Sequence, residues 1–374
     1  MTSPNHGNVV YLAGSRWSDV PGTDRRLVTA LGRIVPVLWV DPPFSVLTRS
    51  RTGSSETPRR GRDEVAPGVT RLQVPAIPGG SRSGLRKLVD QGRAHAIRST
   101  QRSLGAVAGA VIVASPRESF PRGVPGVRVL YVTDDWVAGA GLMALSAARI
   151  EGDLACNLRS ADVAAAVSPS LASHLTGQFG TPVVVLANGC EPHERDYRPV
   201  PGGQAVLVGQ LNDRLDLELL EAVRRDGIPL VVIGPRSLTG PGETTLLDEL
   251  LSSPGVDWRG ALPASLLPEA LAKMGVGLTP YTDTAFNRAS FPLKTLEYLA
   301  AGLPVVSSDL PSVRWLDTDL IEVATGPAEF AQRVAEVLSR PSTAQDRARR
   351  MAFARAHSWQ ARAEQLMRLV SERA

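Results

Sequence analysis

The chain has 374 residues, a formal net charge of +4, 43% hydrophobic residues and 21% charged residues. This composition excludes an intrinsically disordered protein, and the length suits two folded domains. Cys156 and Cys190 are the two cysteines, too few for a disulfide framework, which favours a reducing compartment. The sequence shows neither a secretory signal pattern nor an apolar run long enough to span a bilayer. We therefore expect a cytoplasmic protein.

The positive charge is concentrated in the first half of the chain. Residues 1–190 carry 21 Lys and Arg against 13 Asp and Glu, a net of +8, and residues 191–374 carry 20 against 24, a net of −4. A basic half favours an anionic partner, such as phospholipid head groups or a phosphorylated substrate, although a solvated arginine-rich surface would have the same charge. One hypothesis is that residues 49–62 and a nearby basic helix face dock on the inner face of the cytoplasmic membrane. The side chains of that face are Arg82, Arg86, Lys87, Arg93, Arg98 and Arg102.

Short apolar runs alternate with helical stretches through the first half of the chain. These runs are continuous, which is typical of parallel strands that are covered on both faces. Strands are predicted at residues 9–13, 35–40, 69–74, 110–114, 127–132, 163–167 and 183–186. Helices are predicted at residues 24–33, 85–104 and 142–159, and the polar residues 49–63 are predicted to form a mobile loop.

The same pattern restarts after residues 191–204, which contain three prolines and a Gly-Gly pair and are predicted to be an interdomain linker. Strands are then predicted at residues 205–208, 230–233, 256–258, 276–279, 305–307 and 321–323. Helices are predicted at residues 215–225, 245–251, 264–273, 291–301 and 328–339, and two more in the tail meet near Ser358. Two such arrays predict an α/β fold with two doubly wound, Rossmann-like domains, residues 1–190 and 205–357.

Residues 287–309 form a loop, a helix, a tight stop and a buried strand in this prediction. Ser290 is predicted to cap the helix, with Pro292 in its first turn, and Gly302 to end it. Lys294 and Glu297 are three residues apart and share a face near the helix start. A helix start with a lysine suits a phosphate, and the glutamate could bind ribose hydroxyls. Taken alone, the same pair also fits an ordinary surface helix.

Several motifs follow one another in the order expected for one family. They are VTDDW at residues 132–136, VSPSLASHL at 167–175, LANG at 186–189, VGQLNDRLDLELL at 208–220, VVIGP at 231–235, WRG at 258–260 and FPLKTLEYLAAGLPVVSS at 291–308. With these motifs the sequence resembles the retaining GT-B glycosyltransferases of family 4, in particular a teichuronic-acid-type subgroup.

The resemblance implies two domains that face each other across a cleft, with the last helix, residues 358–374, crossing back to the first domain through Trp359. It implies a nucleotide-diphospho-sugar bound by the second domain and a hydroxyl acceptor bound by the first. The acceptor would be a glycan, a glycolipid or a lipid-linked precursor of the cell envelope. The implied reaction is a metal-independent hexosyl transfer with retention of configuration, and the nucleotide sugar is a co-substrate, with no cofactor expected.

The resemblance also assigns donor contacts. Glu297 matches the glutamate that binds ribose, and Lys294 with the amides before it falls where the diphosphate is held. The predicted donor-binding residues are Gly209, Arg214, Arg259, Ser290, Phe291, Pro292, Leu293, Lys294 and Glu297.

Three positions depart from the family pattern. Ala289 stands where many members have a second glutamate, and Gln210 and Leu215 stand where many have an arginine and a lysine. Arg214, one place before Leu215, could supply the missing charge.

Asp134 and Asp135 follow a predicted strand, so at least one carboxylate should reach the cleft to orient the acceptor hydroxyl or to stabilise positive charge on the sugar. The other could cap the next helix, and the sequence leaves open which does which. Lys294 would stabilise charge on the leaving phosphate. The predicted catalytic residues are therefore Asp134, Asp135 and Lys294. The predicted acceptor-binding residues are Gly14, Arg16, Trp17 and Trp136.

Other classes of function lack their motifs. G-x-G-x-x-G, a P-loop and G-x-S-x-G are absent, which argues against a dehydrogenase, an NTPase and a hydrolase. The five histidines show no ligand spacing, and Asp317-Thr318-Asp319 fits a solvated turn, so no metal site is expected. No nucleic-acid partner is expected. The alternatives are a nucleotide-sugar epimerase of the same architecture and an inactive nucleotide-sugar-binding protein.

Overall fold

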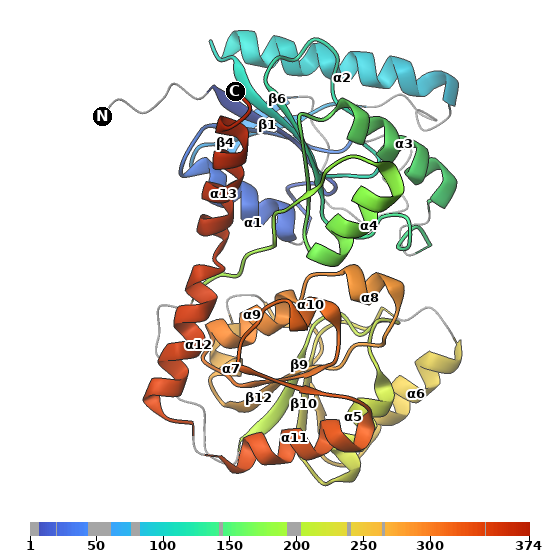
Figure 1. Ribbon diagram of the computed structural model, residues 1–374, viewed down its shortest axis with the longest axis vertical. Coiled ribbons are helices and arrows are strands. Elements are labelled where there is room, and N and C mark those ends of the chain that lie inside the picture. Colours follow the sequence, from blue (N-terminus) through green and yellow to red (C-terminus); the bar gives the residue numbers. More distant parts are fainter. Residues whose placement is uncertain are drawn as a thin grey trace. The chain divides into compact units, whose positions relative to one another are not determined.

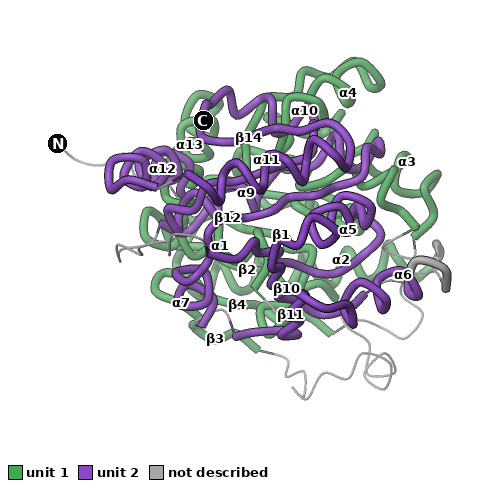
Figure 2. Tube along the Cα trace, turned by 90° about the horizontal axis from the view of Figure 1, so that it is seen from below, with its two compact units in different colours: residues 1–188, 359–374 green, residues 189–358 purple. Residues whose placement is uncertain are grey.

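The computed structural model describes residues 7–19, 21–43, 61–75, 83–141, 145–192, 203–237, 241–263, 266–340 and 342–374. The chain forms two compact units, which Figure 2 shows in different colours. Unit 1 comprises residues 1–188 and 359–374, and unit 2 comprises residues 189–358. Most of the predicted linker, residues 193–202, lies outside the described residues.

Unit 1 is built on one sheet in the order β3-β4-β2-β1-β5-β6-β7-β8. All neighbours are parallel except β3, which is antiparallel to β4. The four strands β1, β2, β5 and β6 carry buried apolar side chains on both faces, as expected where helices cover a parallel sheet. The strands are β1 (Asn8–Leu12), β2 (Val37–Val40), β3 (Gly61–Ala66), β4 (Val69–Gln73), β5 (Ala108–Val113), β6 (Val127–Val132), β7 (Val163–Ala166) and β8 (Val184–Val185).

The edge strand β3 was not predicted from the sequence. Residues 61–63 were expected to belong to a mobile loop, and they pair instead with Gln73 to Arg71 of β4. An ion pair supports this pairing, because Arg71 donates from Nε and Nη2 to the two carboxylate oxygens of Asp63, at 3.0 and 2.9 Å. β3 has no buried residue, so the sequence offers no apolar pattern for it. Residues 49–60 lie outside the described part of the chain.

The helices of unit 1 are α1 (Thr23–Gly32), α2 (Ser83–Ser103), α3 (Ala147–Ser160), α4 (Pro169–Phe179) and α13 (Trp359–Ser371). The last of these packs against α1, although more than 300 residues separate them along the chain (Figure 1). Trp359 is buried, and Gln365 Nε2 donates to the Val185 carbonyl at 3.0 Å. The predicted return of the last helix to the first domain is therefore confirmed.

The predicted basic face of α2 is partly wrong. Arg93 is buried and forms an ion pair with Glu118, which is buried as well. Arg86 Nη1 lies 2.8 Å from a carboxylate oxygen of Asp153. These two arginines tie α2 to neighbouring segments and are not available to a membrane, because their charges are already neutralised.

Unit 2 contains an all-parallel sheet in the order β11-β10-β9-β12-β13-β14. Its strands are β9 (Gln204–Val208), β10 (Leu230–Ile233), β11 (Val256–Trp258), β12 (Met274–Thr279), β13 (Val305–Ser308) and β14 (Ile321–Ala324). Its helices are α5 (Leu217–Arg225), α6 (Pro241–Ser252), α7 (Leu267–Leu271), α8 (Ala285–Ala289), α9 (Leu293–Ala300), α10 (Pro311–Arg314), α11 (Pro327–Ser339) and α12 (Ala344–Ala356).

Helices cover both faces of the second sheet. Val276 and Leu278 of β12 belong to a core cluster with α5 and α11. Gly277, between them, faces the other side, where a Cβ would lie 2.4 Å from the ring of Tyr298 on α9. The glycine thus lets α9 pack closely against the strand. The prediction of an α/β fold with two doubly wound domains is confirmed.

No helix among the described residues is both long enough and apolar enough to cross a bilayer.

Candidate functional site

The helix that carries Lys294 and Glu297 starts two residues later than predicted. α9 runs from Leu293 to Ala300, and Pro292 occupies the N-cap position without a side-chain cap. Ser290 is not the N-cap of this helix, because it ends the short helix α8 and its Oγ donates to the Phe286 carbonyl at 2.8 Å. Phe291 and Pro292 connect the two helices and are buried. The prediction missed α8, since five residues give no clear periodicity.

The end of α9 agrees with its prediction. Gly302 has φ +75° and donates its N–H to the Leu299 carbonyl, so it stops the helix in the left-handed conformation. On the same helix, Tyr298 is fully buried, and its hydroxyl oxygen accepts a 2.7 Å hydrogen bond from the Val208 N–H. This bond joins α9 to the end of β9, where the loop toward Arg214 begins.

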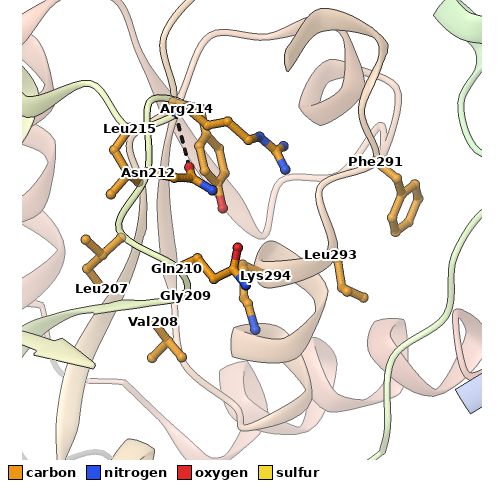
Figure 3. A pocket seen from close by; sticks show the side chains of 11 residues that line it. Leu207, Val208, Gly209, Gln210, Asn212, Arg214, Leu215, Phe291, Leu293 and Lys294 are labelled. Atoms are coloured by element: carbon orange, nitrogen blue, oxygen red, sulfur yellow. Dashed lines mark hydrogen bonds between the residues drawn. The ribbon is translucent and has the colours of Figure 1, made fainter. Parts of the chain in front are cut away.

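A pocket of about 200 Å³ lies beside this junction (Figure 3). Lys294 enters it from α9, and Arg214 enters it from the loop that follows β9. The pocket therefore combines two cations with polar and apolar walls. Its lining residues are Leu207, Val208, Gly209, Gln210, Asn212, Arg214, Leu215, Tyr281, Phe291, Leu293 and Lys294.

Lys294 and Glu297 form an ion pair at the edge of the pocket. Lys294 Nζ lies 2.6 Å from Glu297 Oε2, and the side chains are 27% and 13% exposed. The two residues share one helix face, as the spacing predicted. Because an ammonium group has three donors, Lys294 can contact this carboxylate and a further oxygen acceptor at once.

Two glycines shape the loop beside the lysine. Gly209 has φ +152° and Gly234, at the end of β10, has φ +153°, a region that favours glycine. A Cβ on Gly234 would lie 1.6 Å from the Gly209 carbonyl oxygen. The two strand ends therefore approach so closely that no side chain fits between them, and Gly209 faces Lys294, whose Cε would lie 3.9 Å from an added Cβ.

The residues that depart from the family pattern have defined positions. Gln210 is exposed and Leu215 is buried, and both line the pocket. Ala289 is buried at the end of α8. Neither Gln210 nor Leu215 brings a charge to the pocket, so Arg214 and Lys294 are the cations among its lining residues.

The segment after β11 contains Arg259, one of the predicted donor-binding residues. Arg259 Nε donates to Asp257 Oδ2 at 2.8 Å. Next to it, the Trp258 ring nitrogen donates to the Gly234 carbonyl at 3.1 Å, and the ring is 38% exposed. The Arg236 guanidinium lies 5.2 Å from the centre of that ring. Neither Trp258 nor Arg259 lines the pocket, so donor binding by Arg259 stays a prediction.

In unit 1, the loop after β1 is held by two buried carboxylates. Asp24 accepts from the Tyr11 hydroxyl at 2.8 Å and from the Gly14 N–H at 3.2 Å. Asp41 accepts from the Trp17 N–H at 3.0 Å, among other donors. Burial raises the pKa of both carboxyls, and these hydrogen bonds oppose the rise.

The predicted acceptor residues of this loop therefore differ in exposure. Trp17 is buried, with its ring edge against Trp39 at a centroid distance of 5.2 Å, whereas Arg16 is half-buried. Gly14, Arg16 and Trp17 all lie in the segment that follows β1.

Asp134 and Asp135 follow β6, as predicted, and are both half-buried. Asp135 Oδ1 accepts from the Ala138 N–H at 2.9 Å, so this carboxylate stabilises the turn after the strand. Trp136 is buried beneath the turn. A chemical role for Asp134 or Asp135 stays a prediction.

The possible metal motifs were also located. Asp319 pairs with Arg349 at 2.8 Å on the surface, and this hydrogen bond lowers the pKa of Asp319. Within the described ranges, no three His, Cys, Asp or Glu side chains are grouped as a metal site would require.

Tyr281 and Asn212, which line the pocket, and Asn287, which contacts Arg214, were not among the predicted site residues. Asn287 is 2% exposed and contacts Arg214. Nothing in the sequence distinguishes it from any other loop asparagine.

Comparison with solved structures defines the class of the fold. Sucrose-phosphate synthase from Thermosynechococcus elongatus has a TM-score of 0.72 at 16% identity, with 98% of each chain covered. A glycosyltransferase from Rickettsia africae has a TM-score of 0.66 at 10% identity, with 99% of each chain covered. The Anabaena protein HepE, in complex with UDP and glucose, has a TM-score of 0.66 at 14% identity and covers 98% of this chain and 100% of its own. The chain thus has the GT-B fold of glycosyltransferases.

Sequence comparison adds a family match and one curated relative. Residues 214–368 match a family described as "Glycosyl transferase-like". Over 167 residues the chain is 28% identical to the putative teichuronic acid biosynthesis glycosyltransferase TuaH of Bacillus subtilis (strain 168). That match covers 43% of this chain and 41% of TuaH, so the chain matches about two fifths of the length of this curated relative. The resemblance to GT-B glycosyltransferases, including a teichuronic-acid-type enzyme, is confirmed.

Proposed function

We propose that the protein is a glycosyltransferase that moves a hexose from a nucleotide-diphospho-sugar to a hydroxyl-bearing acceptor. The observation that carries this proposal is the pocket in unit 2, where Lys294 and Arg214 lie among polar and apolar side chains. A volume of about 200 Å³ suits part of such a donor, such as its diphosphate. The match of residues 214–368 to a glycosyl transferase-like family supports the same reading.

The proposed chemistry needs positive charge in this pocket. Transfer breaks the bond between the sugar C1 and the phosphate oxygen, and the electron pair leaves with the phosphate. Lys294 and Arg214 would stabilise this growing negative charge, which is most valuable in the transition state. Glu297 would bind the ribose hydroxyls. We also propose that the reaction needs no metal, and full activity in excess EDTA is the expected result.

The acceptor hydroxyl oxygen then bonds to C1, and we propose that it does so on the face that the phosphate leaves, with retention of configuration. Its proton passes to the leaving phosphate. We propose that Asp134 or Asp135, which both follow β6, orients this hydroxyl. The acceptor class would be a glycan, a glycolipid or a lipid-linked precursor. Peripheral contact with an anionic membrane belongs to the same proposal, and liposome co-sedimentation with and without anionic lipid tests it.

One assay separates this activity from its alternatives. The protein is incubated with a panel of UDP-, GDP- and dTDP-sugars, and free nucleoside diphosphate is measured with and without candidate acceptors. Acceptor-dependent release supports the glycosyltransferase. An isomerised donor would indicate an epimerase, and binding without release or isomerisation would indicate an inactive sugar-nucleotide-binding protein. The anomeric configuration of the product, read by NMR, tests retention.

A further inference from the structure

Arg214 is held in the pocket between two aromatic rings. Its guanidinium carbon lies 5.2 Å from the ring centre of Tyr281 and 5.1 Å from that of Phe286. Planar guanidinium groups stack on aromatic faces, so the two rings restrict the rotation of this side chain. Arginine loses conformational freedom when it is ordered, and these contacts within the protein already restrict that freedom.

Asn287 holds the same arginine through hydrogen bonds. Its Oδ1 accepts from Arg214 Nε at 2.8 Å, and its Nδ2 donates to the Arg214 carbonyl at 3.1 Å. The Nδ2 also donates to the Thr282 carbonyl at 2.9 Å. The amide orientation is unambiguous, because Arg214 Nε can only donate and the two carbonyls can only accept. One buried side chain therefore sets both the backbone and the guanidinium of Arg214.

This arrangement leaves the end of the guanidinium for a ligand. Within the described residues, the guanidinium hydrogen bond of Arg214 uses Nε, and no ion pair joins Arg214 to a carboxylate. Lys294, by contrast, is paired with Glu297. Arg214 is thus the pocket cation whose Nη groups are open to an anion, and a planar fork of donors matches phosphate oxygens.

We propose that Asn287, assisted by Tyr281 and Phe286, is a positioning residue that holds Arg214 as a preformed binder of the donor's diphosphate. The inference rests on the proposed function, because it needs a phosphate-bearing ligand in this pocket. It goes further by stating that a residue outside the pocket lining determines the affinity for phosphate, with little effect on affinity for the nucleoside.

A double-mutant cycle tests this inference. Arg214→Ala, Asn287→Ala and the double variant are titrated calorimetrically with UDP, GDP and dTDP, and the matching nucleosides are titrated as phosphate-free probes. Each single variant should bind the preferred diphosphate about 10-fold more weakly, and the double variant should be no weaker than Arg214→Ala alone. Nucleoside affinity should not change. The inference would be overturned if the affinity loss of the double variant equalled the product of the two single losses. It would also be overturned if the nucleoside lost as much affinity as the diphosphate.

Control variants keep the test decisive if Asn287→Ala unfolds. Phe286→Leu removes one ring and leaves the Asn287 hydrogen bonds in place, and it should weaken diphosphate binding about two- to fivefold. An unchanged affinity in a folded Phe286→Leu protein would also overturn the inference.

Asn157→Ala is the matched control. It removes a buried asparagine of unit 1, whose Nδ2 donates to the Glu118 carbonyl, and this variant should bind as the unaltered protein does. If the unaltered protein binds no nucleoside diphosphate, the proposed function fails as well. If it binds while the Asn287 and Phe286 variants match it, the inference alone fails.

Discussion

Replacing Lys294 by methionine removes one positive charge from the pocket while keeping most of the side-chain volume. Lys294 Nζ lies 2.6 Å from Glu297 Oε2, and its side chain is 27% exposed. A hydrogen bond between a charged group and a phosphate contributes about 1.5–3 kcal/mol, and solvent screening at this exposure favours the lower part of that range. A loss of about 1.5–2 kcal/mol corresponds to roughly 10- to 30-fold weaker binding of a nucleoside diphosphate.

Turnover should fall by a larger factor than affinity, because negative charge on the leaving phosphate grows in the transition state. Isothermal titration with the preferred nucleoside diphosphate measures the first effect, and kcat from acceptor-dependent nucleotide release measures the second. Lys273→Met is the matched control. Its ammonium lies 3.4 Å from Glu269 Oε1 in a pair with exposures of 67% and 73%. Exposed pairs of this kind contribute little, so this variant should behave as the unaltered protein.

The reasoning is refuted if Lys294→Met and Lys273→Met show the same affinity and the same kcat. The ion pair with Glu297 would then be an ordinary helix-surface interaction. If affinity falls and kcat does not, Lys294 binds the donor equally well in the ground state and the transition state, and its assignment as a catalytic residue would be withdrawn.

Three further predictions concern stability. Tyr298→Phe leaves the buried Val208 N–H without its acceptor, so the unfolding free energy from urea titration should fall by about 1–3 kcal/mol, and an unchanged value would contradict the role of this bond. Gly234→Ala should destabilise by about 1–3 kcal/mol, because its Cβ would lie 1.6 Å from a backbone oxygen, whereas Gly152→Ala within α3 meets nothing within 4 Å and should stabilise by about 0.5–1 kcal/mol. Burial raises the pKa of Asp24 above 3.8, so the folded state favours the protonated form, and its contribution to stability is lost as pH rises through the raised pKa. The stability of Asp24→Asn relative to the unaltered protein should therefore increase from about pH 4 upward and then level off, and a difference independent of pH would contradict the prediction.

Much of the fold could be predicted because parallel strands buried on both faces leave continuous apolar runs. The run around Tyr11 and the run around Val206 each became a central strand of its sheet. β3 could not be found in this way, because its pairing with β4 depends on a cross-strand contact between Asp63 and Arg71. Such contacts join residues that carry no periodic signal.

The part of the candidate site on one helix was predictable, because the spacing of residues along the sequence determines which side chains share a helix face. Lys294 and Glu297 follow from helical geometry, and Gly302 follows from the need for positive φ at a helix end. Ser290 was misplaced because a serine before a helix and a serine that ends the preceding short helix look alike in sequence. The surroundings of Arg214 could not be predicted, since they depend on how a separate loop folds back on it.

The discontinuity of unit 1 has a consequence for synthesis of the protein on the ribosome. Trp359 and the rest of α13 complete this unit by packing against α1, and they are translated after the 170 residues 189–358. At roughly 5–20 residues per second, that interval lasts on the order of 10–35 s, during which the apolar surface of α1 that α13 covers stays exposed on the nascent chain. Unit 2, whose residues are contiguous, can fold during the same interval. Unit 1 should therefore complete its fold only after α13 has been synthesised.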